Sequence, residues 1–191
     1  MSNIVKGTFE NALRVAIQEK QIMGIGTYME KTIHIFLKNY FEPNTEFHEM
    51  PLGKKCADIS NEHGIIEIQT RSFNNLRSKL EAFLPENKVT VVYPYAAIKW
   101  LSWLDPETGE ITKKRKSPRK QTVFDSFYEL YKIRPYLSHP NLNVYLIGLE
   151  VEETRLLTGW SKDRKKGSTR VDRLPVKITE DELFDMVNYI R

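Results

Sequence analysis

Three polar residues at a strand-like spacing have the clearest potential for chemistry. Asp58 precedes a short turn over 61–64, and Glu67 and Gln69 follow it. Side chains alternate along a strand, so Glu67 and Gln69 share one face, and a tight turn brings Asp58 beside Glu67. Two close carboxylates resist joint ionisation, whereas a hard cation such as Mg²⁺ prefers oxygen ligands. The pattern therefore predicts a divalent-metal site at Asp58 and Glu67, with the Ile68 carbonyl as a further ligand.

The neighbouring residues fit the same alternation. Ala57 and Ile59 are expected to share the strand face opposite Asp58. A structural alternative stays open, in which Glu67 belongs to the polar face of an amphipathic strand and Asp58 is an acid beside a turn. His34 is left out of the predicted site, because a lone histidine on a helix is more often a hydrogen-bonded side chain than a ligand.

The pattern resembles the PD-(D/E)XK superfamily, which includes restriction endonucleases and Holliday-junction resolvases. In that motif an Asp on one strand is followed, after a short turn, by Glu or Asp, any residue and Lys. Asp58 and Glu67 match the two acids, and Gln69 stands at the usual Lys position. Glu30 matches a third acid that many members carry on the preceding helix. The resemblance covers about residues 28–93 and implies a restriction-endonuclease-like αβββαβ core.

The resemblance also implies a reaction, the hydrolysis of phosphodiester bonds in nucleic acid with Mg²⁺ or Mn²⁺. Asp58 and Glu67 would hold the cation, Gln69 would position the attacking water, and Glu30 would hold a second cation or a water bound to it. Gln hydrogen-bonds a water but cannot offset charge as Lys does. Gln69 therefore supports an alternative, a catalytically inactive nucleic-acid-binding module. A third interpretation is a structural or protein-interaction domain whose basic loops bind an acidic partner.

Positive charge is concentrated in two stretches of a chain whose net charge is only +4. Residues 113–120 hold six cations and no acid, and residues 162–173 hold six cations and two acids. Such segregation steers a polyanion toward one surface, although two solvated loops would give the same pattern. The predicted contacts to nucleic acid, with DNA preferred, come from these runs and from the helix near Phe73: Arg71, Arg77, Lys114, Arg115, Lys116, Arg164, Lys165 and Lys166.

Composition limits the class of protein. Of 191 residues, 40% are hydrophobic and 28% are charged, which suits a globular domain that can bury a core. The single cysteine allows no intrachain disulfide, and the first residues contain no apolar signal segment, so we expect a cytoplasmic protein. No apolar run reaches the ~20 residues that a membrane helix needs. No membrane partner is expected, and the resemblance leaves a homodimer open.

Hydrophobic periodicity and turn residues predict the elements that position these side chains. Helices are expected over 9–21, 26–41, 73–84 and 122–133, and again from Thr179, where Thr179 and Glu182 form a capping box. Strands are expected over 46–52, 56–60, 65–70, 88–93, 144–151 and 174–178. The helix over 73–84 connects two of these strands by a crossover, which places them parallel and side by side.

These elements predict one α/β domain with a central mixed sheet flanked by helices. Its nuclease-like part is expected over residues 1–154, with the core at about 26–93 and an inserted hairpin at about 98–120. Residues 155–191 are expected to form a basic C-terminal elaboration packed on the same domain.

Overall fold

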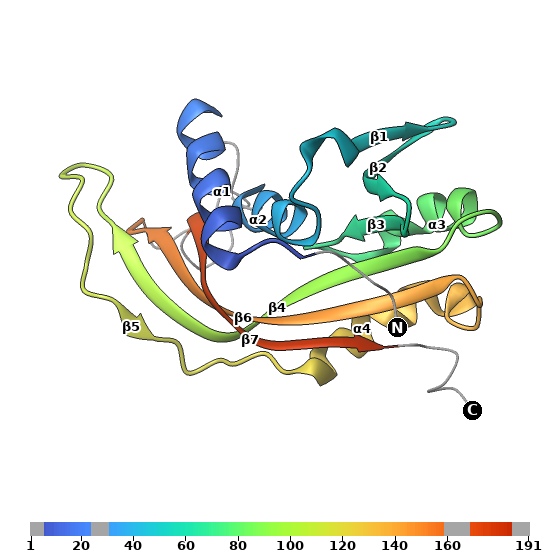
Figure 1. Cartoon of the computed structure of the whole chain (residues 1–191). Coiled ribbons are helices and arrows are strands. Elements are labelled where there is room, and N and C mark those ends of the chain that lie inside the picture. Colours follow the sequence, from blue (N-terminus) through green and yellow to red (C-terminus); the bar gives the residue numbers. More distant parts are fainter. Residues whose placement is uncertain (1–5, 24–30, 159–168, 185–191) are drawn as a thin grey trace.

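The computed structural model describes residues 6–23, 31–158 and 169–184 (Figure 1). Its α-helices are α1 (Phe9–Met23), α2 (Lys31–Phe41), α3 (Arg77–Phe83) and α4 (Phe127–Leu130). Its 3₁₀ helices are η1 (Thr45–Phe47), η2 (Phe73–Leu76), η3 (Val123–Ser126) and η4 (Tyr131–Tyr136). Its strands are β1 (His48–Leu52), β2 (Lys55–Asn61), β3 (Gly64–Ile68), β4 (Val89–Leu104), β5 (Arg115–Lys116), β6 (Leu142–Leu156) and β7 (Arg170–Phe184).

The strands form one mixed, seven-stranded sheet in the order β1-β2-β3-β4-β6-β7, with β5 paired to β4 off this path. The pairs β1/β2, β2/β3 and β6/β7 are antiparallel, whereas β3/β4 and β4/β6 are parallel. The prediction of an α/β domain with a central mixed sheet is confirmed. The predicted crossover is confirmed as well, because η2 and α3 connect β3 to its parallel neighbour β4.

Helices cover both faces of the sheet. In Figure 1, α1 and α2 lie above the long strands and α4 lies below them. One buried cluster joins α1 and α2 to the sheet and includes Phe36 and Ile68. A second cluster joins α3 and η4 to the sheet and includes Leu80 and Ile133. The long, apolar β4 lies between these layers, as a run that is apolar on both faces predicts.

The turn between β2 and β3 requires a glycine. Gly64 has φ +123°, and a Cβ atom at this position would lie 2.6 Å from the carbonyl oxygen of Lys88. The Ile65 amide then donates to that same carbonyl at 2.8 Å, which starts the parallel pairing of β3 with β4. This close approach fixes where β3 enters the sheet, and therefore where Glu67 lies.

The predicted hairpin over 98–120 is present, but its first strand belongs to the main sheet. Residues 98–104 are the second half of β4, which also stays paired with β6 as far as Leu104↔Leu156. After Leu104 the chain turns and returns antiparallel to β4, through the bridge Leu104↔Ile111 and the β5 pairs Leu101↔Arg115 and Trp100↔Lys116. The hairpin is not a separate insertion, because β6 runs alongside β4 and pairs with its other edge, which no local sequence signal reveals.

The predicted C-terminal helix is wrong. Thr179 and Glu182 lie within β7, which pairs with β6 from Arg155↔Arg170 to Val144↔Phe184. The unpaired edge of β6 offers a long row of backbone partners, and filling it outweighs a local capping signal. The expected helix over 122–133 is also broken into η3, α4 and η4, with non-helical backbone at Ile133 two residues before Pro135. In the described part of the chain, no helix is long and apolar enough to cross a membrane.

Candidate functional site

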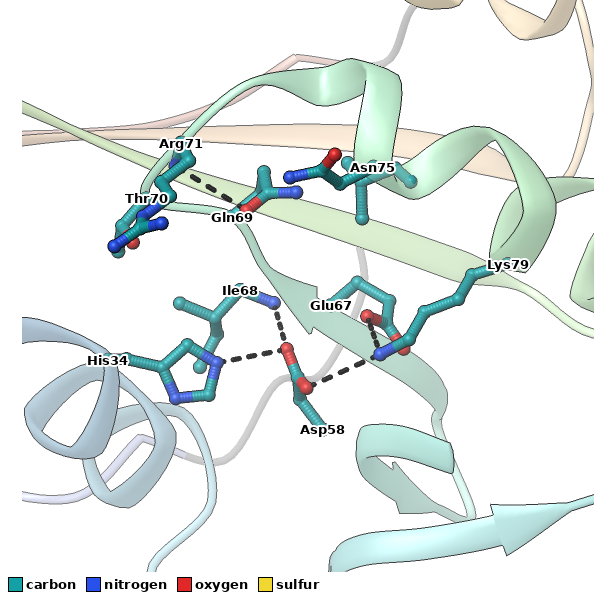
Figure 2. Close-up of a pocket in the computed structure, with 10 residues that line it drawn as sticks. His34, Asp58, Glu67, Ile68, Gln69, Thr70, Arg71, Asn75 and Lys79 are labelled. Carbon is teal, nitrogen blue, oxygen red and sulfur yellow. Dashed lines mark hydrogen bonds and ion pairs between the residues drawn. The ribbon is translucent and has the colours of Figure 1, made fainter. Parts of the chain in front are cut away.

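A cavity of about 420 Å³ opens where β3 ends (Figure 2). The residues that line it are His34, Asp58, Glu67, Ile68, Gln69, Thr70, Arg71, Asn75, Leu76 and Lys79. They come from α2, from the β2/β3 pair, from the turn after β3 and from the η2–α3 segment. The predicted convergence of Asp58, Glu67 and Gln69 on one cleft is confirmed.

Asp58 reaches the cavity because β2 separates from β3 at this point. The antiparallel pairing ends at Ile59↔Ile66, and the Asp58 carboxylate takes the place of a backbone partner by accepting the Ile68 amide at 2.8 Å. Ala57 packs in the core beside α3, whereas Ile59 packs in the core beside α1 and α2. The expectation that Ala57 and Ile59 share one face is therefore wrong, because the strand stops alternating regularly where it leaves its neighbour.

Lys79, on α3, binds both acids. Its Nζ lies 2.7 Å from Glu67 Oε2 and 3.5 Å from Asp58 Oδ1. The predicted site did not include Lys79. Its spacing along the helix could have predicted that Lys79 faces the sheet. Lys79 lies three residues after Leu76 and four before Phe83, and both of these residues are buried against the sheet.

His34, on α2, approaches Asp58 from the other side. Its Nε2 lies 3.2 Å from Asp58 Oδ2, the same oxygen that accepts the Ile68 amide (Figure 2). One carboxylate oxygen is therefore held by two groups, while the other faces Lys79. This arrangement fixes the orientation of Asp58. No local pattern predicted it, because His34 and Asp58 belong to elements that are far apart in the chain.

The pKa values of Asp58 and Glu67 are shifted in opposite directions. Burial and the nearby Asp58 charge raise the pKa of Glu67 to about 7, although Lys79 opposes the shift. Burial also raises the pKa of Asp58, but the hydrogen bond and charge of His34, together with Lys79, more than offset it, so the net pKa is lowered. Burial lowers the pKa of Lys79, but its bonds to the two carboxylates have the larger effect, so the net pKa is raised. When two carboxylates share one site, repulsion between their charges moves their pKa values apart.

Glu67 also carries an unsatisfied atom. Its side chain is 2% exposed, and within the described residues its buried Oε1 has no hydrogen-bond partner. A buried, unpaired carboxylate oxygen is costly unless something binds it. Oxygen is the ligand type that a hard divalent cation selects, so this atom fits such an ion.

The structure describes fewer metal ligands than the prediction included. The Ile68 amide points to Asp58, and because a strand residue directs its N–H and C=O toward the same side, the Ile68 carbonyl lies on that side too. Among the residues that the structure describes, no group of three or more His, Cys, Asp or Glu could hold a metal. Glu30, the predicted third acid, lies outside the described residues.

Gln69 lines the cavity but bonds to its own turn. Its Nε2 donates to the Ser72 carbonyl at 3.2 Å, and its Oε1 accepts the Arg71 amide at 3.4 Å. These contacts close the turn between β3 and η2. The Gln69 side chain thus stabilises the backbone of this turn, and the amine beside the two acids belongs to Lys79.

The predicted nucleic-acid contacts are spread over two places. Arg71 lines the cavity, and exposed Arg77 begins α3. The other three described contacts lie at the far end of β4, roughly 30 Å away along the strand at ~3.3 Å per residue. There Lys114 pairs with Glu152, Arg115 lies 4.3 Å from the Trp103 ring centre, and Lys116 lies 5.7 Å from that of Trp100. Arg164, Lys165 and Lys166 lie outside the described residues.

Comparison with known proteins identifies a family. The family model described as a domain of unknown function (DUF8091) matches residues 31–185, so the chain belongs to this family. The match includes every residue that lines the cavity. An uncharacterized protein of Treponema pallidum (strain Nichols) is 29% identical over 163 residues, which covers 85% of this chain and 64% of the relative's length. The chain therefore spans less than two thirds of that relative. No solved structure matches.

Proposed function

We propose that this member of the DUF8091 family is a metal-dependent nuclease, which hydrolyses phosphodiester bonds in nucleic acid, preferably DNA. The observation that carries the proposal is the cluster of Asp58, Glu67 and Lys79, in which one amine reaches two buried carboxylates where two strands separate. The residue types match the PD-(D/E)XK motif, with the amine supplied by α3 instead of by position 69. The order α2-β1-β2-β3-α3-β4 supports a restriction-endonuclease-like core.

A purely structural role explains the cluster poorly. Two acids share one ammonium group, and one buried oxygen of Glu67 has no partner within the described residues. Such an arrangement lowers the free energy of unfolding, because a buried charge without full compensation is unfavourable. Strongly shifted pKa values inside a cavity are typical of functional sites. A site that reduces stability in this way is consistent with a ligand that completes it.

Asp58 and Glu67, together with the Ile68 carbonyl, would hold Mg²⁺ or Mn²⁺. When bound, such an ion supplies Lewis-acid chemistry by polarising the phosphate that is to be cleaved. The free Oε1 of Glu67 is the donor already available for it. Glu30 stays a prediction as a further ligand.

The chain's own residues supply the other parts of the reaction. Lys79 keeps its charge, because its pKa is raised, and its ammonium group can stabilise the negative charge that develops on the phosphate. His34 fixes the orientation of Asp58. Gln69 holds the turn that places Arg71 at the cavity, where its guanidinium group suits a neighbouring phosphate. Positioning of the attacking water, predicted for Gln69, is shared with Lys79 in this arrangement.

A second candidate is a nucleic-acid-binding module without catalysis. The observation that favours it is the placement of the Lys79 ammonium group between the two carboxylates, where it already neutralises part of their charge. A domain that never binds a cation would keep this ion pair permanently.

One experiment separates the two candidates. The purified protein is incubated with labelled single-stranded, duplex and branched DNA and with RNA, in Mg²⁺, Mn²⁺ or EDTA. We expect cleavage with either metal and none in EDTA, abolished by Asp58→Ala and retained by Glu81→Ala, which removes an exposed acid from α3. Metal-independent binding with no cleavage of any substrate would reject the nuclease and leave the binding module.

A further inference from the structure

A second charged cluster surrounds Glu153 on β6. The Glu153 side chain is fully buried, and three guanidinium groups bind it: Arg155 Nη2 at 2.5 Å, Arg173 Nη2 at 2.8 Å and Arg170 Nε at 3.1 Å. Lys99 Nζ lies further away, at 3.9 Å. The four cations come from three neighbouring strands, β4, β6 and β7, so only the folded sheet assembles them.

Among the residues that the structure describes, the cluster around Glu153 contains more cations than acids. Four cations face one carboxylate, and the nearby acid Asp172 is paired with a further cation, Lys20 of α1. Burial lowers the pKa of Lys99, and repulsion from the three arginines lowers it further. Burial and the neighbouring Arg173 likewise lower the pKa of Arg170. Counted over Glu153 and these four cations alone, the net charge is +3, which attracts an anion.

The cations that surround Glu153 remain accessible. The side chains of Arg155 and Arg170 are each 31% exposed, and that of Arg173 is 21% exposed. Glu153 therefore holds one side of the Arg155 and Arg173 guanidinium groups in place, while both side chains keep a surface that a ligand can reach. Prearranged guanidinium forks of this kind suit phosphate oxygens.

The cluster connects with the cavity at β3. A small pocket lined by Thr70 and Arg173 adjoins the main cavity, because Thr70 lines both. On the other side Arg155 pairs in register with Trp103, whose ring Arg115 covers at 4.3 Å. Register partners in neighbouring strands share a face, so Arg155 and Trp103 lie on the same side of the sheet. Cations thus extend from the cavity across the far half of the sheet, where β4 and β6 bend toward α1 (Figure 1).

We infer that Lys99, Arg155, Arg170 and Arg173 form a second binding site for the phosphate backbone of the nucleic acid that enters the cavity. This inference rests on the proposed function, which supplies the polyanion. Ile68 pairs with Val92, and Val92 pairs with Tyr145, so Glu153 lies eight residues along β6 from the cavity. Because β4 and β6 bend and Arg173 lies in the pocket that also contains Thr70, roughly 26 Å at ~3.3 Å per residue is the upper limit of that separation. Duplex DNA rises ~3.4 Å per base pair, so the site contacts backbone within about eight base pairs of the cleaved bond.

The spacing gives a test that depends on substrate length. Binding is measured in EDTA, without cleavage, by fluorescence anisotropy at several salt concentrations. The probes are a labelled duplex long enough to reach both sites and one too short to do so. The variants are Arg155→Gln/Arg170→Gln, the charge-preserving Arg155→Lys/Arg170→Lys, and Lys177→Gln, which removes an exposed cation elsewhere on β7.

For the glutamine double variant we expect roughly tenfold weaker binding of the long duplex and a salt slope smaller by about 2, one for each lost phosphate contact. Its affinity for the short duplex, and the affinities of the lysine variant and of Lys177→Gln, should stay close to wild type. If the double variant unfolds, Arg155→Gln alone should reduce the slope by about 1. Equal affinity and slope for the long duplex would overturn the inference.

The outcomes also separate this inference from the proposed function. A wild type that cleaves DNA while the glutamine variant binds normally rejects the second site alone. A wild type that binds the long duplex through these arginines but never cleaves rejects the nuclease chemistry and keeps the second site. Absence of salt-dependent binding to any nucleic acid rejects both.

Discussion

Glu67 and Glu153 are both glutamates buried in one sheet, yet their surroundings shift their pKa values in opposite directions. Burial and the charge of Asp58 raise the pKa of Glu67 to about 7. Burial acts on Glu153 in the same sense, but the charges of Arg173 and Arg170 outweigh it and lower the pKa to about 2. The difference lies in the number of opposite charges that each residue meets: one shared ammonium group for Glu67, and three guanidinium groups and a lysine for Glu153.

Neither cluster is balanced, and the sign of the imbalance indicates the ligand. Within the described residues, the Glu67 cluster has one cation for two acids and an oxygen without a partner, which supports the proposal that a metal cation binds there. The Glu153 cluster has four cations around one acid, which supports the proposal that phosphate binds there. One nucleic-acid chain, with its cleaved phosphate at the metal and a second phosphate at the arginines, would fit both clusters.

Apart from loss of the acids themselves, replacing Lys79 should have the largest effect on the first cluster. Lys79→Met is expected to lower metal-dependent cleavage by about 10²- to 10⁴-fold, the range for a group that assists proton transfer or stabilises the transition state. Gln69→Lys in that background should restore part of the activity, since it returns an amine to the usual motif position. Single-turnover cleavage rates test this. Equal rates for Lys79→Met and wild type would remove Lys79 from the reaction.

Replacing Glu153 should reduce stability. Glu153→Gln leaves three guanidinium groups and a lysine without their shared carboxylate, which should lower the free energy of unfolding by about 2–3 kcal/mol, below the usual range for a broken buried pair because the arginines are partly exposed. The folded-state pKa is depressed, so this contribution is present above pH 4.5 and is lost as pH falls toward about 2. Denaturant unfolding at neutral pH measures it, and an unchanged midpoint would contradict the role of Glu153 as organiser.

Replacing Glu67 should act in the opposite sense. The folded-state pKa of Glu67 is raised from 4.5 to about 7, so its contribution to stability is complete below pH 4.5 and is lost as pH rises through about 7. Glu67→Gln mimics the protonated form and should raise the free energy of unfolding by about 1–2 kcal/mol at pH 8, with little change at pH 5.

The same variant should lose its response to metal. Mn²⁺ is expected to raise the melting temperature of the wild type more at pH 8 than at pH 5, since protons compete with the cation for Glu67. Glu67→Gln should show no such shift, whereas Glu81→Gln, an exposed acid on α3, should respond like wild type. A wild type that Mn²⁺ fails to stabilise at either pH would argue against the metal site.

The smallest effect is expected at His34. His34→Ala removes the partner 3.2 Å from Asp58 Oδ2, while the Ile68 amide still holds that oxygen. Cleavage should fall by roughly tenfold or less, as the loss of about one hydrogen bond implies. His34→Gln, which keeps a donor, should recover most of it. A loss as large as that of Asp58→Ala would instead make His34 a direct participant.

The contrast between the two clusters also shows what sequence patterns can reveal. Asp58, Glu67 and Gln69 lie within twelve residues, on two strands joined by a short turn and directly after the second strand, so their closeness in the chain was enough to predict that they meet at one cavity. The cluster around Glu153 draws on residues as far apart as Lys99 and Arg173. Its charges were visible only in part, as members of a basic run, because pairing between distant strands leaves no local periodic signal.

By itself the sequence determined the elements whose backbone and side chains are satisfied locally. These include α1, the strands β1 to β3 with their short turns, the crossover through α3, and the first acids of the candidate site. Hydrophobic periodicity and turn residues act over a few residues, so they specify such segments well.

Only the tertiary structure decided the rest. The C-terminal segment is a strand, β7, because pairing with the open edge of β6 outweighs the local capping box. β4 is longer than predicted because β6 pairs with it as far as Leu104. The tertiary structure also placed Lys79 and His34 on either side of Asp58, and it enclosed Glu153 with cations from three strands. In each case the deciding interaction joins residues far apart in the chain, and its energy exists only once the sheet has formed.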